Sequence, residues 1–96
     1  MYPVNFEAQL YHYQDYTGNE IDAVIEMPDG GWCGIEIKLG ANKIEEAARN
    51  LIHIRDQIAK DGGKTPSALI IVCGLSNAAY QRSDGVYVTP LTALKD

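Results

Sequence analysis

The sequence predicts an α/β domain in which an antiparallel three-strand meander leads through one crossover helix into a buried strand and a short edge strand of a mixed sheet. Alternating strand-like runs joined by tight turns predict the meander. A change to helical spacing over residues 42–61 predicts the helix. The continuous apolar run ALIIVC that follows has the length of a strand buried on both faces.

The meander is expected over residues 10–16, 20–27 and 32–39. Aromatic residues alternate in the first run, and TGN follows as a hairpin turn. The second run, EIDAVIEM, alternates strictly, and its apolar side consists of Ile21, Ala23, Ile25 and Met27. After the PDGG turn, the run WCGIEIKL places its charged residues on the side of Trp32 and Gly34. Residues 4–10 fit either a turn or two of helix or a plain lead-in to the sheet.

The helix is expected from Asn42 to Asp61, where apolar residues recur every three or four positions. Glu45, three residues after Asn42, predicts a capping interaction at the helix start, and DGG predicts its end. A strand follows at residues 67–74, then the loop YQRSDG, a short strand at residues 86–90 and a last helical turn. A strand, a helix and a buried strand in succession predict a parallel crossover.

The composition is that of an ordinary globular protein, with 46% hydrophobic and 22% charged residues. The length predicts one domain over residues 1–96. The longest apolar run is far shorter than the ~20 residues of a membrane span, and the start lacks the features of a secretory signal, which predicts a cytoplasmic protein. Cys33 and Cys73 lack zinc-site spacing and are expected to be buried thiols. The net charge of −5 argues against a general nucleic-acid-binding surface.

Charged residues interrupt the second and third strands in two pairs, Glu20 with Asp22 and Glu36 with Lys38. If the strands pair through the PDGG turn, these residues meet on one sheet surface. Mg²⁺ and Mn²⁺ prefer oxygen ligands, so Asp22, Glu36 and the carbonyl of Ile37 are candidate metal ligands. Lys38 would orient an attacking water or stabilise developing charge. Such a site would hydrolyse a phosphodiester.

The same charges also fit an interpretation without chemistry, in which a solvated sheet face is stabilised by cross-strand ion pairs. Strand alternation alone favours this interpretation. A second polar group lies on the outer side of the helix and consists of Arg49, His53, Gln57 and Lys60. That stripe is either a small phosphate-contacting surface or, as is more common, simply solvated.

Asp22, followed after thirteen residues by Glu36-Ile37-Lys38, resembles the Asp…Glu-x-Lys signature of the PD-(D/E)XK nuclease superfamily. The order of elements resembles the core of that superfamily. The longer stretches YHYQDYTGNEIDAVIEMPDGGWCGIEIKLG, IEEAARNLIHIRD and QRSDGVYVTPLTAL resemble a nuclease-like domain of unknown function that follows the ATPase core in a group of prokaryotic AAA+ ATPases. The likeness covers residues 10–94.

This resemblance implies a restriction endonuclease-like fold and a Mg²⁺- or Mn²⁺-dependent endonuclease acting on DNA. It implies that Asp22 and Glu36 bind the metal and that Lys38 is the catalytic lysine. It also implies auxiliary roles for Glu20 in the second strand and for a polar residue on the helix, Gln57.

The chain departs from the family at its start, where a few residues stand in place of a full first helix and Glu7 is a poor substitute for its acidic residue. The ATPase core is also missing, so the chain is expected to be an excised C-terminal domain of a longer ATPase. The expected partners are DNA and the parent or partner ATPase domain. The alternative is an inactive nuclease-fold module that mediates protein interaction or assembly of the parent ATPase.

Overall fold

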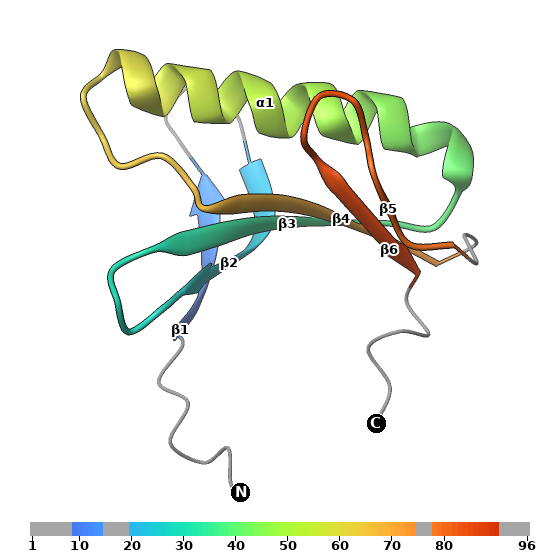
Figure 1. Cartoon of the computed structure of the whole chain (residues 1–96), viewed down its shortest axis with the longest axis horizontal. Coiled ribbons are helices and arrows are strands. Elements are labelled where there is room, and N and C mark those ends of the chain that lie inside the picture. Colours follow the sequence, from blue (N-terminus) through green and yellow to red (C-terminus); the bar gives the residue numbers. More distant parts are fainter. Residues whose placement is uncertain (1–8, 15–19, 75–77, 91–96) are drawn as a thin grey trace, which may run out of the picture.

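A computed structural model of the chain describes residues 9–14, 20–74 and 78–90, with side chains described from Glu20 onwards. It contains a six-stranded sheet in the order β1-β2-β3-β4-β6-β5, with one α-helix lying over one face (Figure 1). The strands are β1 (Gln9–Gln14), β2 (Glu20–Glu26), β3 (Trp32–Lys38), β4 (Ala68–Cys73), β5 (Tyr80–Gln81) and β6 (Tyr87–Pro90). The helices are the short 3₁₀ turn η2 (Ala41–Lys43) and α1 (Ile44–Lys60).

The predicted mixed sheet is confirmed. β1, β2 and β3 form the antiparallel meander, and α1 connects β3 to β4, which run parallel. β6 was expected at the edge, and this expectation is wrong because β6 pairs with both β4 and β5. A tight turn at Gly85, with φ of +92°, folds the expected loop back as a hairpin, so part of that loop becomes the outer strand β5. The TGN turn, residues 4–8 of the possible first helix or lead-in, and the last helical turn lie outside the described residues, while Gln9 and Leu10 belong to β1.

The helix starts differently from the prediction. Asn42 lies in η2, and within the described residues neither η2 nor α1 has a side-chain capping hydrogen bond. The backbone closes this turn instead, with the Lys43 N–H donating to the Gly40 carbonyl at 3.0 Å. The predicted end is confirmed, because the three DGG amides donate to carbonyls of the last helical turn and Gly62 has φ of +81°. Neither helix in the described part of the chain is long and apolar enough to cross a membrane.

The hydrophobic core lies between α1 and the sheet. The helix contributes one buried stripe, consisting of Ile44, Ala47, Ala48, Leu51 and Ile54. The sheet contributes the facing residues Ile21, Val24, Leu69, Ile71, Cys73 and Val88, and Val86, just before β6, joins them. Full burial of a large aliphatic side chain is worth about 1.5–3 kcal/mol, so this stripe determines how α1 docks. Cys73 is buried as expected, whereas Cys33 is only half-buried, and both are free thiols.

β2 contains a bulge that strict alternation does not predict. Between the residues paired with β1, two residues of β2, Asp22 and Ala23, oppose a single residue of β1. The extra residue lets Ile21 and Val24 both reach the core, where they are 0% and 9% exposed. Alternation had placed them on opposite faces. A β-bulge re-aims the side chains next to it, and here the residue at the bulge is the predicted metal ligand Asp22.

The helix covers the face of β3 that carries Gly34 and Glu36. A Cβ atom at Gly34 would lie 3.3 Å from Leu69 Cδ2 and 3.5 Å from Ile21 Cδ1, both of which belong to the core. Glu36 is two residues further along and therefore points to the same face. The opposite face has no helix over it within the described residues (Figure 1), and it is formed mainly by Cys33, Ile35, Ile37, Ile70, Val72 and Tyr87. The charges of β3 thus lie on the covered face and its isoleucines on the uncovered one.

Leu51→Ala is expected to lower the free energy of unfolding by about 2–5 kcal/mol, because it removes a buried side chain and leaves a cavity. Leu51 is 0% exposed beneath α1. Leu39→Ala is the matched control, since Leu39 is 75% exposed; its effect should stay within about 0.5 kcal/mol. Urea denaturation followed by circular dichroism measures both variants, and equal losses would contradict the packing of α1.

Candidate functional site

β2 and β3 separate where two carboxylates meet. The last residues paired between these strands are Ala23 and Ile35. At the next step the Asp22 N–H donates to Glu36 Oε2 at 3.2 Å, and the Ile37 N–H donates to Asp22 Oδ2 at 2.9 Å. The Glu36 carboxylate of β3 therefore accepts from a backbone N–H of β2, and the Asp22 carboxylate of β2 accepts from a backbone N–H of β3. Each replaces the backbone carbonyl that would accept this N–H if the strands were still paired. Both side chains are held across the gap by their own hydrogen bonds.

Lys38 lies beside this pair. Its Nζ atom is 3.7 Å from Glu36 Oε1, and its side chain is 34% exposed. Asp22 is exposed as well, so solvent reaches the group from this end of the sheet. The structure thus brings together all three residues that the sequence analysis singled out for catalysis, with the backbone of Ile37 next to them.

Glu36 is the buried member of the group, at 4% exposure. Burial raises the pKa of its carboxyl above the usual 4.5, and the negative charge of Asp22 raises it further. The backbone N–H of Asp22 and the Lys38 ammonium act in the opposite direction without cancelling the rise in pKa. The interpretation as a solvated face is therefore wrong for Glu36. A buried carboxylate beside a second negative charge is an arrangement that a bound cation would stabilise.

The donor set fits a hard divalent cation of the Mg²⁺ type. Asp22 Oδ2 and Glu36 Oε2 bridge the strands, which leaves one further oxygen on each carboxylate. In the described part of the chain no three His, Cys, Asp or Glu side chains come together, so two carboxylates are what the side chains offer. Mg²⁺ commonly takes one or two carboxylates and keeps several waters. The Ile37 carbonyl stays a predicted third ligand.

Asn50 is the residue at this end of the sheet that the sequence analysis missed. Its Nδ2 atom donates to the carbonyl of Glu20, at the start of β2, at 3.1 Å. Gln57, the predicted auxiliary residue, is exposed and lies ~10 Å further along the helix axis. Asn50 is three residues after Ala47 and four before Ile54, both of which are buried. Its position beside the buried stripe is a signal in the sequence that Asn50 borders the sheet, but not that it bonds to β2. The auxiliary roles of Glu20 and Gln57 stay predictions.

An ion pair connects the first turn of α1 to the β5–β6 hairpin. Arg82 Nη2 lies 2.9 Å from Glu45 Oε1, and Arg82 Nε lies 3.1 Å from Asp84 Oδ2. These carboxylates raise the pKa of the Arg82 guanidinium above its usual value, and the hydrogen bond that Arg82 donates to Glu45 has the largest effect. The outer helix stripe that includes His53 is exposed, as predicted.

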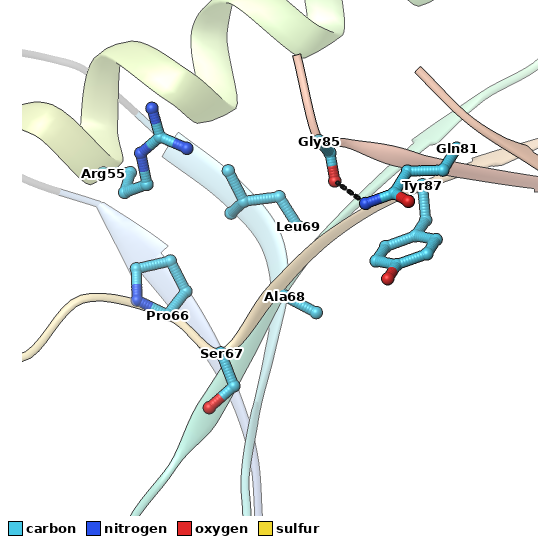
Figure 2. A pocket seen from close by; sticks show the side chains of 8 residues that line it. All are labelled: Arg55, Pro66, Ser67, Ala68, Leu69, Gln81, Gly85 and Tyr87. Carbon is cyan, nitrogen blue, oxygen red and sulfur yellow. Dashed lines mark hydrogen bonds between the residues drawn. The ribbon is translucent and has the colours of Figure 1, made fainter. Parts of the chain in front are cut away.

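A pocket of about 160 Å³ lies away from the carboxylates, where β4 begins before its pairing with β6. It is lined by Arg55, Pro66, Ser67, Ala68, Leu69, Gln81, Gly85 and Tyr87. Figure 2 shows Arg55 on the helix side of β4, the Tyr87 ring on the other side, and one hydrogen bond, from Gln81 to the Gly85 carbonyl. Because its polar groups do not converge on one point, this pocket is not the candidate site.

Fold and site together define a class of small mixed α/β domain, in which a bulged strand and its neighbour present an aspartate, a glutamate and a lysine where they separate. The chain belongs to the family described as Domain of unknown function (DUF4143), whose model matches residues 1–94. No curated protein and no solved structure matches it. The predicted membership of a domain family of unknown function is confirmed, whereas none of these comparisons supports the nuclease superfamily.

Asp22→Asn is expected to lower the pKa of Glu36, because it removes the adjacent negative charge and keeps an oxygen for the Ile37 N–H. Lys38→Met is expected to raise that pKa further, because it removes the ammonium. Titration of the Glu36 carboxyl carbon by NMR measures both shifts. Asp56→Asn removes an exposed charge on α1 and should leave the pKa unchanged. Shifts of the same sign in the two site variants would be incompatible with the geometry.

The raised pKa of Glu36 also makes stability depend on pH. Because the folded protein holds this proton more tightly, the contribution of Glu36 to stability is full below its unfolded pKa near 4.5 and is lost as pH rises through the raised folded value. Glu36→Gln, which keeps the acceptor for the Asp22 N–H, should therefore be more stable than the unsubstituted protein at pH 7. The difference should disappear below about pH 4.

Urea denaturation at several pH values measures this difference. Glu46→Gln, at an exposed position of α1, is the matched control and should show no pH-dependent gap. A Glu36→Gln variant that is less stable than the unsubstituted protein at pH 7 would refute the assigned direction.

Proposed function

We propose that this domain is a metal-dependent phosphodiesterase that cleaves DNA, with Asp22, Glu36 and Lys38 as its working residues. The observation that carries the proposal is the buried Glu36, held beside Asp22 and Lys38 where β2 and β3 separate. A protein has little reason to bury a carboxylate next to another one unless a positive charge compensates them. The Lys38 ammonium supplies one such charge, and a divalent cation would supply the rest.

Each working residue has a role that follows from its position. The oxygens of Asp22 and Glu36 that do not accept from the opposite strand would bind the cation at the solvent-facing end of the gap; that of Glu36 is Oε1, which lies 3.7 Å from Lys38 Nζ. Bound Mg²⁺ or Mn²⁺ supplies polarisation of the phosphoryl oxygen and a lower pKa for the attacking water. Lys38, held near Glu36 Oε1, would donate hydrogen bonds to the phosphate oxygens that gain negative charge. Ile37 lies between Glu36 and Lys38 in β3, and its backbone N–H holds the Asp22 carboxylate in place by a hydrogen bond.

The overall charge of −5 bears on how DNA would be held. Affinity for duplex DNA rests largely on lysine and arginine contacts to phosphates, and acidic residues outnumber basic ones here by 13 to 8. We therefore propose that an attached or partner AAA+ ATPase domain supplies the main DNA contacts. This domain would then contribute the chemistry.

A second candidate function is that of an inactive nuclease-fold module which assembles with the parent ATPase. It is favoured by the apolar residues next to the site, since Ile37 and Leu39 are 53% and 75% exposed. Exposed apolar side chains gathered in one place are typical of protein contacts. The two candidates differ in whether the carboxylate pair binds metal.

Titration of the ¹⁵N-labelled protein with Mn²⁺ is expected to broaden first the amide signals of Asp22, Glu36 and Ile37. Asp22→Asn should abolish this selective broadening, because it removes one of two anionic ligands. Asp56→Asn is the matched control and should broaden as the unsubstituted protein does. Diffuse broadening over all acidic residues would reject the metal site and leave the inactive module.

Cleavage of single- and double-stranded DNA oligonucleotides in Mn²⁺ tests the chemistry separately. Lys38→Met should reduce the cleavage rate by about 10²-fold or more while Mn²⁺ still broadens the same amides, because it removes charge stabilisation and no metal ligand. A Lys38→Met variant with full activity would exclude the assigned role of this lysine.

A further inference from the structure

We infer that Asn50 of α1 is a positioning residue that sets the separation of the Asp22 and Glu36 carboxylates. Its amide holds the start of β2, two residues before Asp22, through the hydrogen bond to the Glu20 carbonyl. The consequence for metal binding rests on the proposed function. The effect on the carboxylate bridge, meaning the hydrogen bonds from the Asp22 N–H to Glu36 and from the Ile37 N–H to Asp22, does not rest on that function.

The start of β2 needs such support because its pairing with β3 ends early. After the pair Ala23–Ile35, side-chain hydrogen bonds take over on the β3 side of β2. Asp22 and Glu36 bond across the gap, and Asn50 of α1 bonds to the Glu20 carbonyl. On the β1 side the backbone pairing continues through Glu20. The start of β2 is therefore held by β1 on one side and by Asn50 of α1 on the side of the gap.

The helix provides a firm anchor for Asn50. The neighbouring Leu51 is 0% exposed, and Ile54 one turn later is 1% exposed, so this stretch of α1 is locked against the sheet. Asn50 as a whole is half-buried at the margin of this packing, and the hydrogen bond of its amide is exposed. Because the Asn50 side chain is short, its hydrogen bond fixes the distance between α1 and the Glu20 carbonyl of β2. Substitution of a group that hydrogen-bonds a metal ligand commonly changes metal affinity by about 10–100-fold. Asn50 acts one step further away, through the backbone before Asp22, so the lower end of this range is expected.

Loss of the Asn50 donor would remove the hydrogen bond that ties the Glu20 carbonyl to α1. A backbone carbonyl that loses a donor adjusts to find another, and this adjustment would move the backbone that carries Asp22. The two amides of the carboxylate bridge, those of Asp22 and Ile37, would report the movement directly, since each donates across the gap. These amides can be observed without any metal.

The test compares Asn50→Leu with Asn42→Leu in the ¹⁵N-labelled protein. Leucine matches asparagine in size and lacks the donor, and Asn42 is an exposed asparagine in η2. Asn50→Leu is expected to shift the Asp22 and Ile37 amide signals in the metal-free protein and to weaken Mn²⁺ binding roughly tenfold or more. Asn42→Leu should do neither. Ile54→Val, a core variant of the same helix, shows what general destabilisation does and should leave Mn²⁺ affinity unchanged.

The outcomes separate the two proposals. If the unsubstituted protein does not bind Mn²⁺ at Asp22 and Glu36, the proposed function fails, while the metal-free amide shifts still decide the role of Asn50. If Mn²⁺ binds and Asn50→Leu alters neither its affinity nor these two amides, the positioning role is wrong. If Asn50→Leu and Ile54→Val weaken Mn²⁺ binding equally, Asn50 acts only through stability and the inference is likewise overturned.

Discussion

Backbone groups that lose their partners where two strands separate must find other hydrogen bonds. At the Asp22–Glu36 step of this sheet, carboxylates replace the missing backbone acceptors, and the Asp22 and Ile37 amides donate to them across the gap. The bulge in β2, the end of the β2–β3 ladder and the pairing of the two acids are thus parts of one arrangement. Each acid is needed locally by the backbone of the other strand, which explains how two negative side chains are held so close together.

The position of α1 gives this arrangement its electrostatic character. The helix docks on the face that carries Glu36, so the carboxylate is withdrawn from water while Asp22 stays exposed. The pKa of Glu36 is raised for that reason, and Lys38 offsets only part of the cost. A site in this state favours an added positive charge. Packing and chemistry are therefore coupled, because the core stripe that seats the helix also desolvates the acid.

The two faces of the sheet differ in a way that bears on partners. The covered face combines the hydrophobic core with the charged residues of β3, whereas the uncovered face is apolar over several strands and includes Ile37, which is 53% exposed. Parallel strands are usually covered on both faces. The candidate site thus lies at one end of a sheet whose second face carries no helix within the described residues, next to the surface that the inactive-module hypothesis would use.

The sequence by itself determined the order and type of the main elements and the grouping of Glu36 with Lys38, because alternation and helical spacing are local properties of the chain. The tertiary structure alone decided that a bulge falls at Asp22, that the helix covers the charged face of β3, and that Asn50 reaches β2. It also placed β6 inside the sheet, since a hairpin adds β5 beyond it. These features depend on which strand lies beside which and on how a helix seats against them. Such contacts join residues distant in sequence, so no local pattern specifies them.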